Sequence, residues 1–254
     1  MGGAQVRGIW TGVRERVLAL RSAPNRKAVF GAEFHGHGHG FDLLPVLTEE
    51  QVAAVERHRG VTFPTEYRGF LLEVGAGGAG PDYGLFPVRP VGPDTPPAPP
   101  HLARPFRPER TRQLAAHQDA EPLRDAYGDT PEEEARFRRD HHIWDRREDE
   151  LLATLAEGTL CVSEQGCGYY TLLALTGPER GTMWHDARAA AEGALPVEFV
   201  GRPGRVTFAA WYLHWLNRAE RHATRPPETT RATPWPTEGR RHASAEDGPP
   251  TPSA

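Results

Sequence analysis

Three histidines, His35, His37 and His39, alternate with glycines in a short tract near the N-terminus. Imidazole is the commonest metal-binding side chain in proteins, and short His-rich tracts hold zinc or nickel. Alternate residues of an extended segment point the same way, but the intervening glycines leave the geometry of such ligands unfixed. We therefore interpret the tract as a glycine-rich loop, with adventitious metal binding as the alternative, and predict no metal site and no cofactor.

Cys161 and Ser163 are the side chains that a nucleophilic mechanism would use, with a histidine as their base. Ser163 lies in no Gly-x-Ser-x-Gly elbow, and strand alternation puts Cys161 on the apolar side of a predicted strand. The other cysteine, Cys167, is six positions away, so the pair lacks the CxxC spacing of zinc and redox sites. We therefore expect both candidate nucleophiles to pack in the core and both thiols to be reduced.

Other catalytic patterns fail on order or spacing. His141 and His142 lie among carboxylates, but the chain contains neither an HExxH nor an HxxEH pattern, so a solvated helix is the better interpretation. The glycine cluster at 75–80 follows a predicted helix instead of preceding one, so no helix N-terminus faces an anion there. Lys27 is the only lysine and has none of the contexts that P-loops, protein kinases or pyridoxal enzymes require. We predict that the protein is not an enzyme, with a divergent hydrolase as a remote alternative.

Composition narrows the class of partner. The 254 residues carry a formal charge of −4, with 38% apolar residues, 27 glycines and 25 prolines. These values indicate a compact domain with irregular stretches, and they lack the basic footprint of a general nucleic-acid binder. No apolar run approaches the ~20 residues that cross a bilayer, and the N-terminus lacks a secretory signal pattern. We expect a cytoplasmic protein that binds neither membranes nor nucleic acid directly, and a basic partner would suit its charge.

Three helices are predicted in the first third of the chain, from hydrophobic periodicity and end signals. They span 5–21, 48–59 and about 64–75. The second has the clearest start, because Thr48 and Gln51 form a capping box in which each side chain accepts from the backbone of the other.

Four strands and a closing helix are predicted on either side of a long insertion. The strands are 83–88, 159–163, 169–175 and 181–185, each bounded by turn residues. The last three form an antiparallel meander. The closing helix begins at Thr207 or Phe208, and its stripe of large aromatic side chains should cover the sheet. After about 222 the chain has almost no core-forming residues and is predicted to be disordered.

The insertion covers about 90–157. Prolines are too dense from 90 to 108 for helix or central strand, so a surface loop is expected there. Residues 119–157 hold 13 Asp or Glu and 6 Arg, a local charge of −7 with neutral histidines. Scattered apolar residues predict one or two helices packed on one side, and such a charge run is typical of a solvated face.

The order of these blocks resembles that of the Smi/Knr-like proteins of the SUKH superfamily. The opening block, 47–75, holds an acidic helix, a Phe63-Pro64 step where the family usually has Leu-Pro, and an acidic-Tyr pair and a Phe-Leu pair before the glycines. Three later blocks follow in the family's order: 166–173 for its central strand, 181–186 for its glycine-to-tryptophan strand and 208–216 for its closing Trp-rich helix. The resemblance covers roughly 30–220.

This resemblance implies an α+β fold, in which helices flank a central antiparallel or mixed sheet, followed here by a disordered C-terminal tail. Combined with the composition, it predicts a helical extension at 1–29, a SUKH-like domain at 30–222 that carries the insertion, and the tail at 223–254.

The resemblance also implies a function class. Many bacterial members are thought to be immunity proteins that bind and neutralise toxins, often nucleases, whereas the fungal members resemble regulatory scaffolds. No family position is catalytic. We therefore expect a non-catalytic protein-binding domain, with an immunity protein for a cognate toxin as the first hypothesis. A regulatory scaffold and a small-molecule or peptide-binding module are the alternatives, and the latter predicts a deep apolar pocket with a few polar groups.

Acidic and aromatic residues form the predicted partner-binding surface. Tyrosine at a rim is enriched among the residues that dominate binding energy, and an acidic block would steer a basic partner. The predicted partner-binding residues are Asp82, Tyr83, Tyr169, Tyr170, Glu132, Glu133 and Glu134. The alternatives are half-buried sheet packing for the tyrosines and a solvated helix face for the glutamates.

Overall fold

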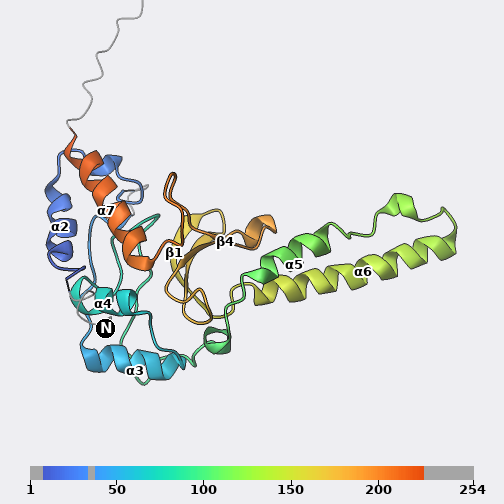
Figure 1. The fold of residues 1–254 in the computed structure, drawn as a ribbon, viewed down its shortest axis with the longest axis horizontal. Coiled ribbons are helices and arrows are strands. Elements are labelled where there is room, and N and C mark those ends of the chain that lie inside the picture. Colours follow the sequence, from blue (N-terminus) through green and yellow to red (C-terminus); the bar gives the residue numbers. More distant parts are fainter. Residues whose placement is uncertain (1–7, 34–37, 226–254) are drawn as a thin grey trace, which may run out of the picture.

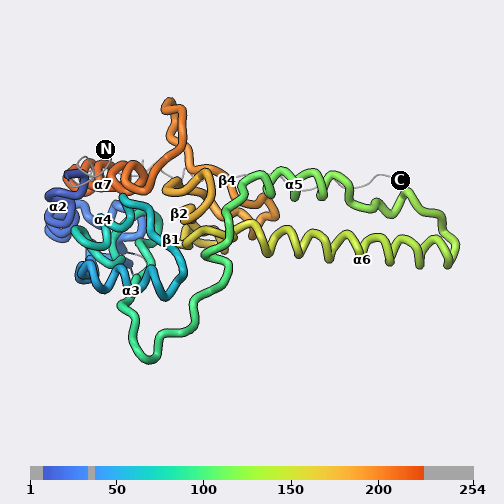
Figure 2. The backbone as a smooth tube through the Cα atoms, turned by 60° about the horizontal axis from the view of Figure 1, so that its bottom comes forward, coloured from blue at the N-terminus to red at the C-terminus, as the bar shows by residue number. Residues whose placement is uncertain are grey.

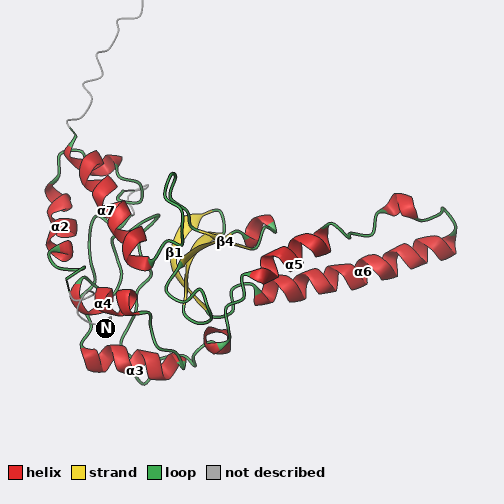
Figure 3. Ribbon diagram, viewed as in Figure 1, coloured by secondary structure: helices red, strands yellow, loops and turns green. Residues whose placement is uncertain are grey.

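The computed structural model describes residues 8–33 and 38–225, which form an α+β fold (Figures 1 and 3). The α-helices of this part are α2 (Val13–Ala19), α3 (Glu49–Arg59), α4 (Thr65–Glu73), α5 (Glu109–Gln118), α6 (Pro131–Thr154) and α7 (Phe208–Thr224). The strands are β1 (Thr159–Gly166), β2 (Tyr169–Ala174), β3 (Met183–Asp186) and β4 (Ala194–Pro196). Short 3₁₀ turns are η1 (Leu20–Ser22), η2 (Arg26–Ala28), η3 (Pro100–Ala103), η4 (Arg124–Ala126) and η5 (Arg188–Ala190). The predicted fold class is confirmed, and most of the predicted tail lies outside the described residues.

The predicted helix starts are confirmed where a side chain caps the helix. At α3 the Thr48 hydroxyl accepts from the Gln51 N–H at 3.2 Å, and the Gln51 side chain accepts from the Thr48 N–H at 2.9 Å. Thr207 caps α7 by accepting from the Ala210 N–H, without a reciprocal bond. The prediction of one helix over 5–21 is wrong at its start, because residues 8–12 form turns and Gly12 in the left-handed conformation precedes α2. Such a residue does not continue an α-helix.

The strands form an antiparallel sheet in the order β1-β2-β3-β4. Both faces of β2 are buried: Leu173 belongs to the main core, whereas its neighbour Leu172 packs with Phe106, Trp184 and Ala194 on the other side. The meander is thus confirmed, and β4 is a fourth strand that the sequence did not predict. The predicted strand at 83–88 makes isolated bridges at Leu85 instead of a regular strand.

The main core lies between the sheet and the helices α2, α3, α4 and α7, which gather on one side of it (Figure 1). Trp10 joins the N-terminal segment to this core. Its ring is 1% exposed and meets the rings of Phe70 and Tyr212 edge-on, and its Nε1 donates to the Glu66 carbonyl at 2.9 Å. Burying a Trp side chain of this size stabilises the fold by about 3 kcal/mol or more.

The helices α5 and α6 form an antiparallel hairpin that projects from the body on the side opposite α2 and α7 (Figures 1 and 2). We call the segment Glu109–Thr154 the arm. The prediction of one or two helices in 119–157 is confirmed by α6, which is 24 residues long. The predicted loop at 90–108 is irregular except for η3, and α5 was not predicted. Only Leu114 of α5 is buried, so its apolar pattern is too sparse to be recognised.

Candidate functional site

A polar cluster lies on the sheet face that turns toward the main core. Asp82 comes from the loop after α4, and Gln165, Thr171 and His185 come from three adjacent strands. The Thr171 hydroxyl donates to Asp82 Oδ2 at 2.8 Å, and the Gln165 amide donates to Thr171 Oγ1 at 2.9 Å. The same amide lies 2.8 Å from His185 Nδ1. The sheet therefore holds a carboxyl group and an imidazole in fixed positions.

The cluster also fixes the chemistry of these two groups. Because the Gln165 amide donates to Nδ1, the neutral His185 ring carries its proton on Nε2. Burial lowers the pKa of His185, and the charge of Asp82 opposes this shift. Burial raises the pKa of Asp82, against the hydrogen bonds from Thr171 and Ser163. The cluster thus presents a neutral imidazole N–H donor beside a carboxyl group.

Asp82 and His185 line a groove with a volume of about 850 Å³. Its walls are α7, the loop that follows β4, and the segments 28–30 and 81–82. Figure 2 shows the loop after β4 in orange, standing out beside α7. The two short segments approach closely because Gly31 has no side chain: a Cβ there would lie 1.9 Å from the Asp82 carbonyl oxygen. A groove of this size falls in the range of ligand sites, roughly 300–1,000 Å³.

The groove combines aromatic and cationic groups. Trp211 and Trp215 line it from α7, and the ring of Phe199 stacks on His214 with centroids 4.3 Å apart. Burial and the charges of the nearby arginines Arg218, Arg202 and Arg221 lower the pKa of His214. This end of the groove is therefore locally positive, although the chain as a whole has a net charge of −4.

Four of the predicted binding residues, Asp82, Tyr83, Tyr169 and Tyr170, lie near the end of the β1–β2 hairpin. The Tyr83 N–H donates to the Glu164 carbonyl at 3.1 Å, and its ring lies against Gly166, where a Cβ would be 3.2 Å from Cε2. Tyr169 pairs with Gly166 across the hairpin, and Tyr170 follows it. The three tyrosines are half-buried, and Tyr169 and Tyr170, as neighbours in a strand, point to opposite faces of the sheet.

The arm is held together along its length by side chains. Trp144 of α6 stacks on His117 of α5 with centroids 4.9 Å apart and an interplanar angle of 12°. Two reciprocal contacts reinforce the stack, because Trp144 Nε1 donates to the His117 carbonyl at 2.9 Å and His117 Nε2 lies 3.0 Å from the Trp144 carbonyl. The two helices therefore form one unit instead of two independent segments.

The remaining predicted residues, Glu132, Glu133 and Glu134, lie in the first turn of α6 at the far end of the arm. The structure therefore does not bring them together with the tyrosines. Thr130 caps this turn by accepting from the Glu133 N–H at 3.3 Å. Acidic side chains at a helix N-terminus are stabilised by the helix dipole. Residues 125–134 contain five carboxylates, three of which pair with flanking arginines: Asp129 with Arg124, Glu133 with Arg136 and Glu134 with Arg138.

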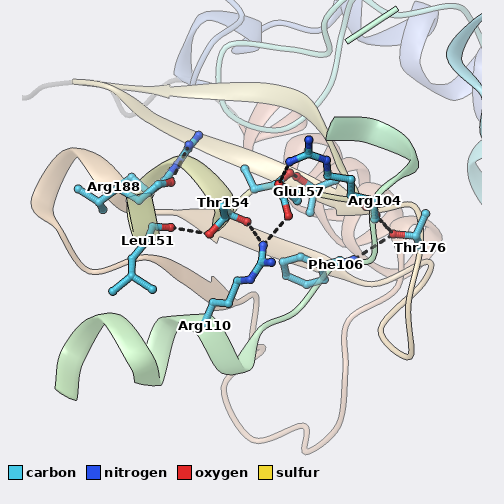
Figure 4. A network of polar contacts seen from close by, with 12 residues as sticks. Arg104, Phe106, Arg110, Leu151, Thr154, Glu157, Thr176 and Arg188 are labelled. Atoms are coloured by element: carbon cyan, nitrogen blue, oxygen red, sulfur yellow. Dashed lines mark hydrogen bonds and ion pairs between the residues drawn. The ribbon is translucent and has the colours of Figure 1, made fainter. Parts of the chain in front are cut away.

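A buried carboxylate fixes the root of the arm to the body (Figure 4). Glu157 is 5% exposed and accepts from Arg104 and from Arg110, the latter at 2.5 Å. Arg110 also donates to the Thr154 carbonyl at 2.8 Å, so α5 is tied to the end of α6. Burial alone would raise the pKa of Glu157, but the two arginines outweigh it and hold the pKa below its usual value.

The candidate nucleophiles differ in placement. Ser163 is fully buried as predicted, and its hydroxyl lies 3.1 Å from the Pro81 carbonyl and 3.0 Å from that of Gly84, so it ties this loop to β1. The predicted burial of Cys161 is wrong, since its side chain is exposed. A register shift between Cys161 and Ser163 breaks the alternation and turns both Val162 and Ser163 inward. Both cysteines are free thiols, as expected.

The histidine tract is only partly described, because His35 and His37 lie outside the described residues. His39 is buried, packs edge-on against the rings of Phe41 and Trp215, and accepts from the Phe41 N–H at 3.1 Å. Within the part that the structure describes, no three His, Cys, Asp or Glu side chains gather closely enough to hold a metal ion.

The groove residues were missed by sequence reasoning, apart from Asp82. His185 and Gln165 are 20 positions apart, and Thr171 and Asp82 are 89 positions apart, so only the register of the sheet reveals that they meet. The available signal was the short predicted meander, which brings polar side chains of alternate positions to one face.

The whole arrangement is a four-stranded sheet with a helical layer on one side, a projecting arm and a groove beside α7. The chain matches the SMI1 / KNR4 family (SUKH-1) over residues 46–192, more than half of its length, and it belongs to this family. The matched span runs from just before α3 through the arm to η5 and leaves out α7. No curated protein and no solved structure matches the chain. No helix among the described residues has the length and apolar character needed to cross a bilayer.

Proposed function

We propose that this protein is a non-catalytic, immunity-type binding domain that neutralises a toxin, and that a basic nuclease is the kind of toxin that suits its charge. Membership of the SUKH-1 family is consistent with an immunity-type or regulatory domain. The arm is the observation that supports the proposal most directly.

The arm contributes little to the body's own core. Its buried apolar residues are Leu114 and Leu151, which pack with Leu155 in a small cluster at the root. Farther out, Leu123 is 66% exposed and Ile143 is 59% exposed. A stable hairpin that carries exposed apolar side chains away from the body is a suitable surface for another protein.

The acidic residues at the tip of the arm indicate which kind of partner it would bind. Five carboxylates stand at its tip, on Asp125, Asp129, Glu132, Glu133 and Glu134. The negative charge that the flanking arginines leave uncompensated attracts a basic surface and accelerates encounter, in a manner that salt weakens. A nuclease must bind phosphates and therefore presents a basic surface, which the arm would cover by taking the place of the nucleic acid.

The test uses a toxin domain encoded beside this gene as the ligand. Replacing Glu132, Glu133 and Glu134 by Gln removes three charges without shortening a side chain. Binding at low salt should weaken by about tenfold or more, since each charge contributes up to about 1 kcal/mol, and the dependence on salt should become shallower. The matched control replaces three carboxylates of the body: Glu50, Glu73 and Glu192.

An equal loss of toxin affinity in the control and in the arm variant would contradict the proposal. Toxin binding by the wild type that is as strong at high salt as at low salt would also contradict it. If the neighbouring toxin does not bind at all, the regulatory scaffold becomes the better hypothesis. The groove supports a second function, recognition of a peptide segment, since it is a pocket with convergent polar groups.

A further inference from the structure

The groove beside α7 lies outside the arm and is lined by other residues. We propose that it binds an extended, acidic peptide segment of a partner protein, with carboxylates at the arginine end and the peptide backbone at Asp82 and His185. This proposal goes beyond the one for the arm, and its test requires no knowledge of the partner. Three properties of the groove support it.

The first property is the pairing of one acceptor with one donor on the groove wall. The Asp82 carboxyl group accepts hydrogen bonds, and His185 carries its proton on Nε2 because Gln165 donates to Nδ1. An extended peptide presents alternating N–H and C=O groups, which complement such a pair. Both wall groups are held by the sheet, so little ordering is needed when a peptide binds.

The second property is the aromatic wall. Trp211 and Trp215 line the groove from consecutive turns of α7, and Phe199 faces them from the loop after β4. Phe199 is already stacked on His214, so its position is fixed. Aromatic walls of this kind accept an apolar side chain, and Trp is among the residues most enriched in binding hot spots.

The third property is the local positive charge. Arg202 and Arg218 both line the groove and are exposed, and Arg221 adds to the field around His214. An exposed arginine pairs well with a carboxylate, because its fork of N–H groups matches the two oxygens. Because the carboxylates of Glu198 and Asp82 also line the groove, it suits separate carboxylates that alternate with uncharged residues better than the continuous negative charge of a nucleic-acid backbone.

The experiment uses the full chain and three terminally blocked heptapeptides of alternating residues: Glu-Leu, Gln-Leu and Lys-Leu. Binding is followed by the NMR signals of the indole N–H groups of Trp211 and Trp215, assigned with single Trp→Phe variants. The Glu-Leu peptide should shift these signals saturably, and the Gln-Leu peptide should bind about tenfold more weakly or worse. The Lys-Leu peptide should not shift them.

Two charge-reversal variants locate the contact. Arg202→Glu with Arg218→Glu should weaken the Glu-Leu peptide by about tenfold or more, since two ion pairs are lost. The control, Arg139→Glu with Arg146→Glu, makes the same change of net charge on exposed residues of the arm and should leave binding unchanged. An unchanged backbone NMR spectrum shows that each variant is folded.

Several outcomes would overturn the proposal. These are the absence of any shift at millimolar Glu-Leu peptide, equal binding of the three peptides, or equal effects of the two double variants. Tighter binding of an oligothymidylate than of the Glu-Leu peptide would assign the groove to single-stranded nucleic acid instead. No toxin is present in the peptide experiment, so a negative result there would not affect the proposal for the arm. In the same way, a negative result with the arm variant and the toxin would not affect the proposal for the groove.

Discussion

Glu157 shows how much a single buried charge does in this fold. Its carboxylate joins Arg104, from the segment before α5, to Arg110 of α5 itself, at the point where α6 ends and the sheet begins. Replacing Glu157 by Gln should lower the free energy of unfolding at pH 7 by about 1–3 kcal/mol. This loss is smaller than is usual when a buried ion pair is broken, because Arg104 is 59% exposed and water solvates it when the carboxylate is lost.

The pH dependence of this effect has a definite sign. The folded chain holds the pKa of Glu157 below its unfolded value, so the stabilisation is complete above that value and is lost as the pH falls through the folded pKa. Urea denaturation from pH 7 to pH 3 should show the wild type and Glu157→Gln converging at the acidic end. The exposed control Glu150→Gln should change stability by less than about 0.5 kcal/mol. If the unfolding free energies of the wild type and Glu157→Gln differed by the same amount at every pH, the charge of Glu157 would not be the cause of the stabilisation.

His39 leads to a second prediction about pH, in which stability is lost because a buried basic group stays neutral. Burial lowers its pKa to about 4, against the smaller opposing effects of Phe30 and Asp42. In the unfolded chain the imidazole of His39 then binds a proton near pH 6.5, whereas in the folded chain it stays neutral at that pH. Stability should therefore fall as the pH drops from about 6.5 to about 4, and level off below that. His39→Asn, which keeps an acceptor for the Phe41 N–H, should flatten this part of the curve of unfolding free energy against pH; parallel curves would disprove the assignment.

At the scale of elements, the arm depends on the clamp between Trp144 and His117. Trp144→Ala removes the stacked ring and its hydrogen bond, so α5 and the outer part of α6 should open more often, while the body keeps its protection. Amide hydrogen exchange should become faster by about tenfold or more in the arm alone, for a local loss of about 1.4 kcal/mol. Ile143→Ala, at an exposed neighbouring position, is the matched control. Equal exchange in both variants would mean that the clamp is not what joins the helices.

Local signals made several elements predictable. The capping box at Thr48, the aromatic stripe of α7 and the turn residues of the meander each act over a few positions, and all three elements were found. These local signals fail where a contact between residues far apart in the sequence determines the structure. α5 buries only Leu114 and is stabilised by α6, and Cys161 faces outward because of a bulge that alternation alone does not reveal.

The candidate site was less predictable than the fold for the same reason. Asp82 and the three tyrosines lie near one end of the sheet, but Tyr170 faces the side opposite Asp82, and the sequence alone did not predict this. The position of His185 in the groove depends on the register of the sheet, and that of the arginines around His214 depends on packing between the loop after β4 and α7. No local pattern records that packing. Whether the tyrosines and the glutamates bind a partner stays a prediction.

At the scale of the whole molecule, the arm and the body should be separable. Joining Gln118 directly to Glu148 through Gly-Asn-Gly removes the outer arm at a point where these two side chains already meet at 2.9 Å. The cluster of Leu114, Leu151 and Leu155 at the root is kept. The free energy of unfolding of the body should change by less than about 1 kcal/mol, while small-angle X-ray scattering should report a shorter maximum dimension. Loss of cooperative unfolding would show that the outer arm is part of the folding unit.

The attachment of α6 at one end gives it the mechanics of a lever. At 1.5 Å per residue its 24 residues reach about 36 Å, so a pivot of about 5° at Glu157 displaces the far carboxylates by about 3 Å. A displacement of that size is comparable to the length of a hydrogen bond. The ion pairs of Glu157 and the apolar cluster of Leu114, Leu151 and Leu155 at the root therefore together limit how far the distant carboxylates move.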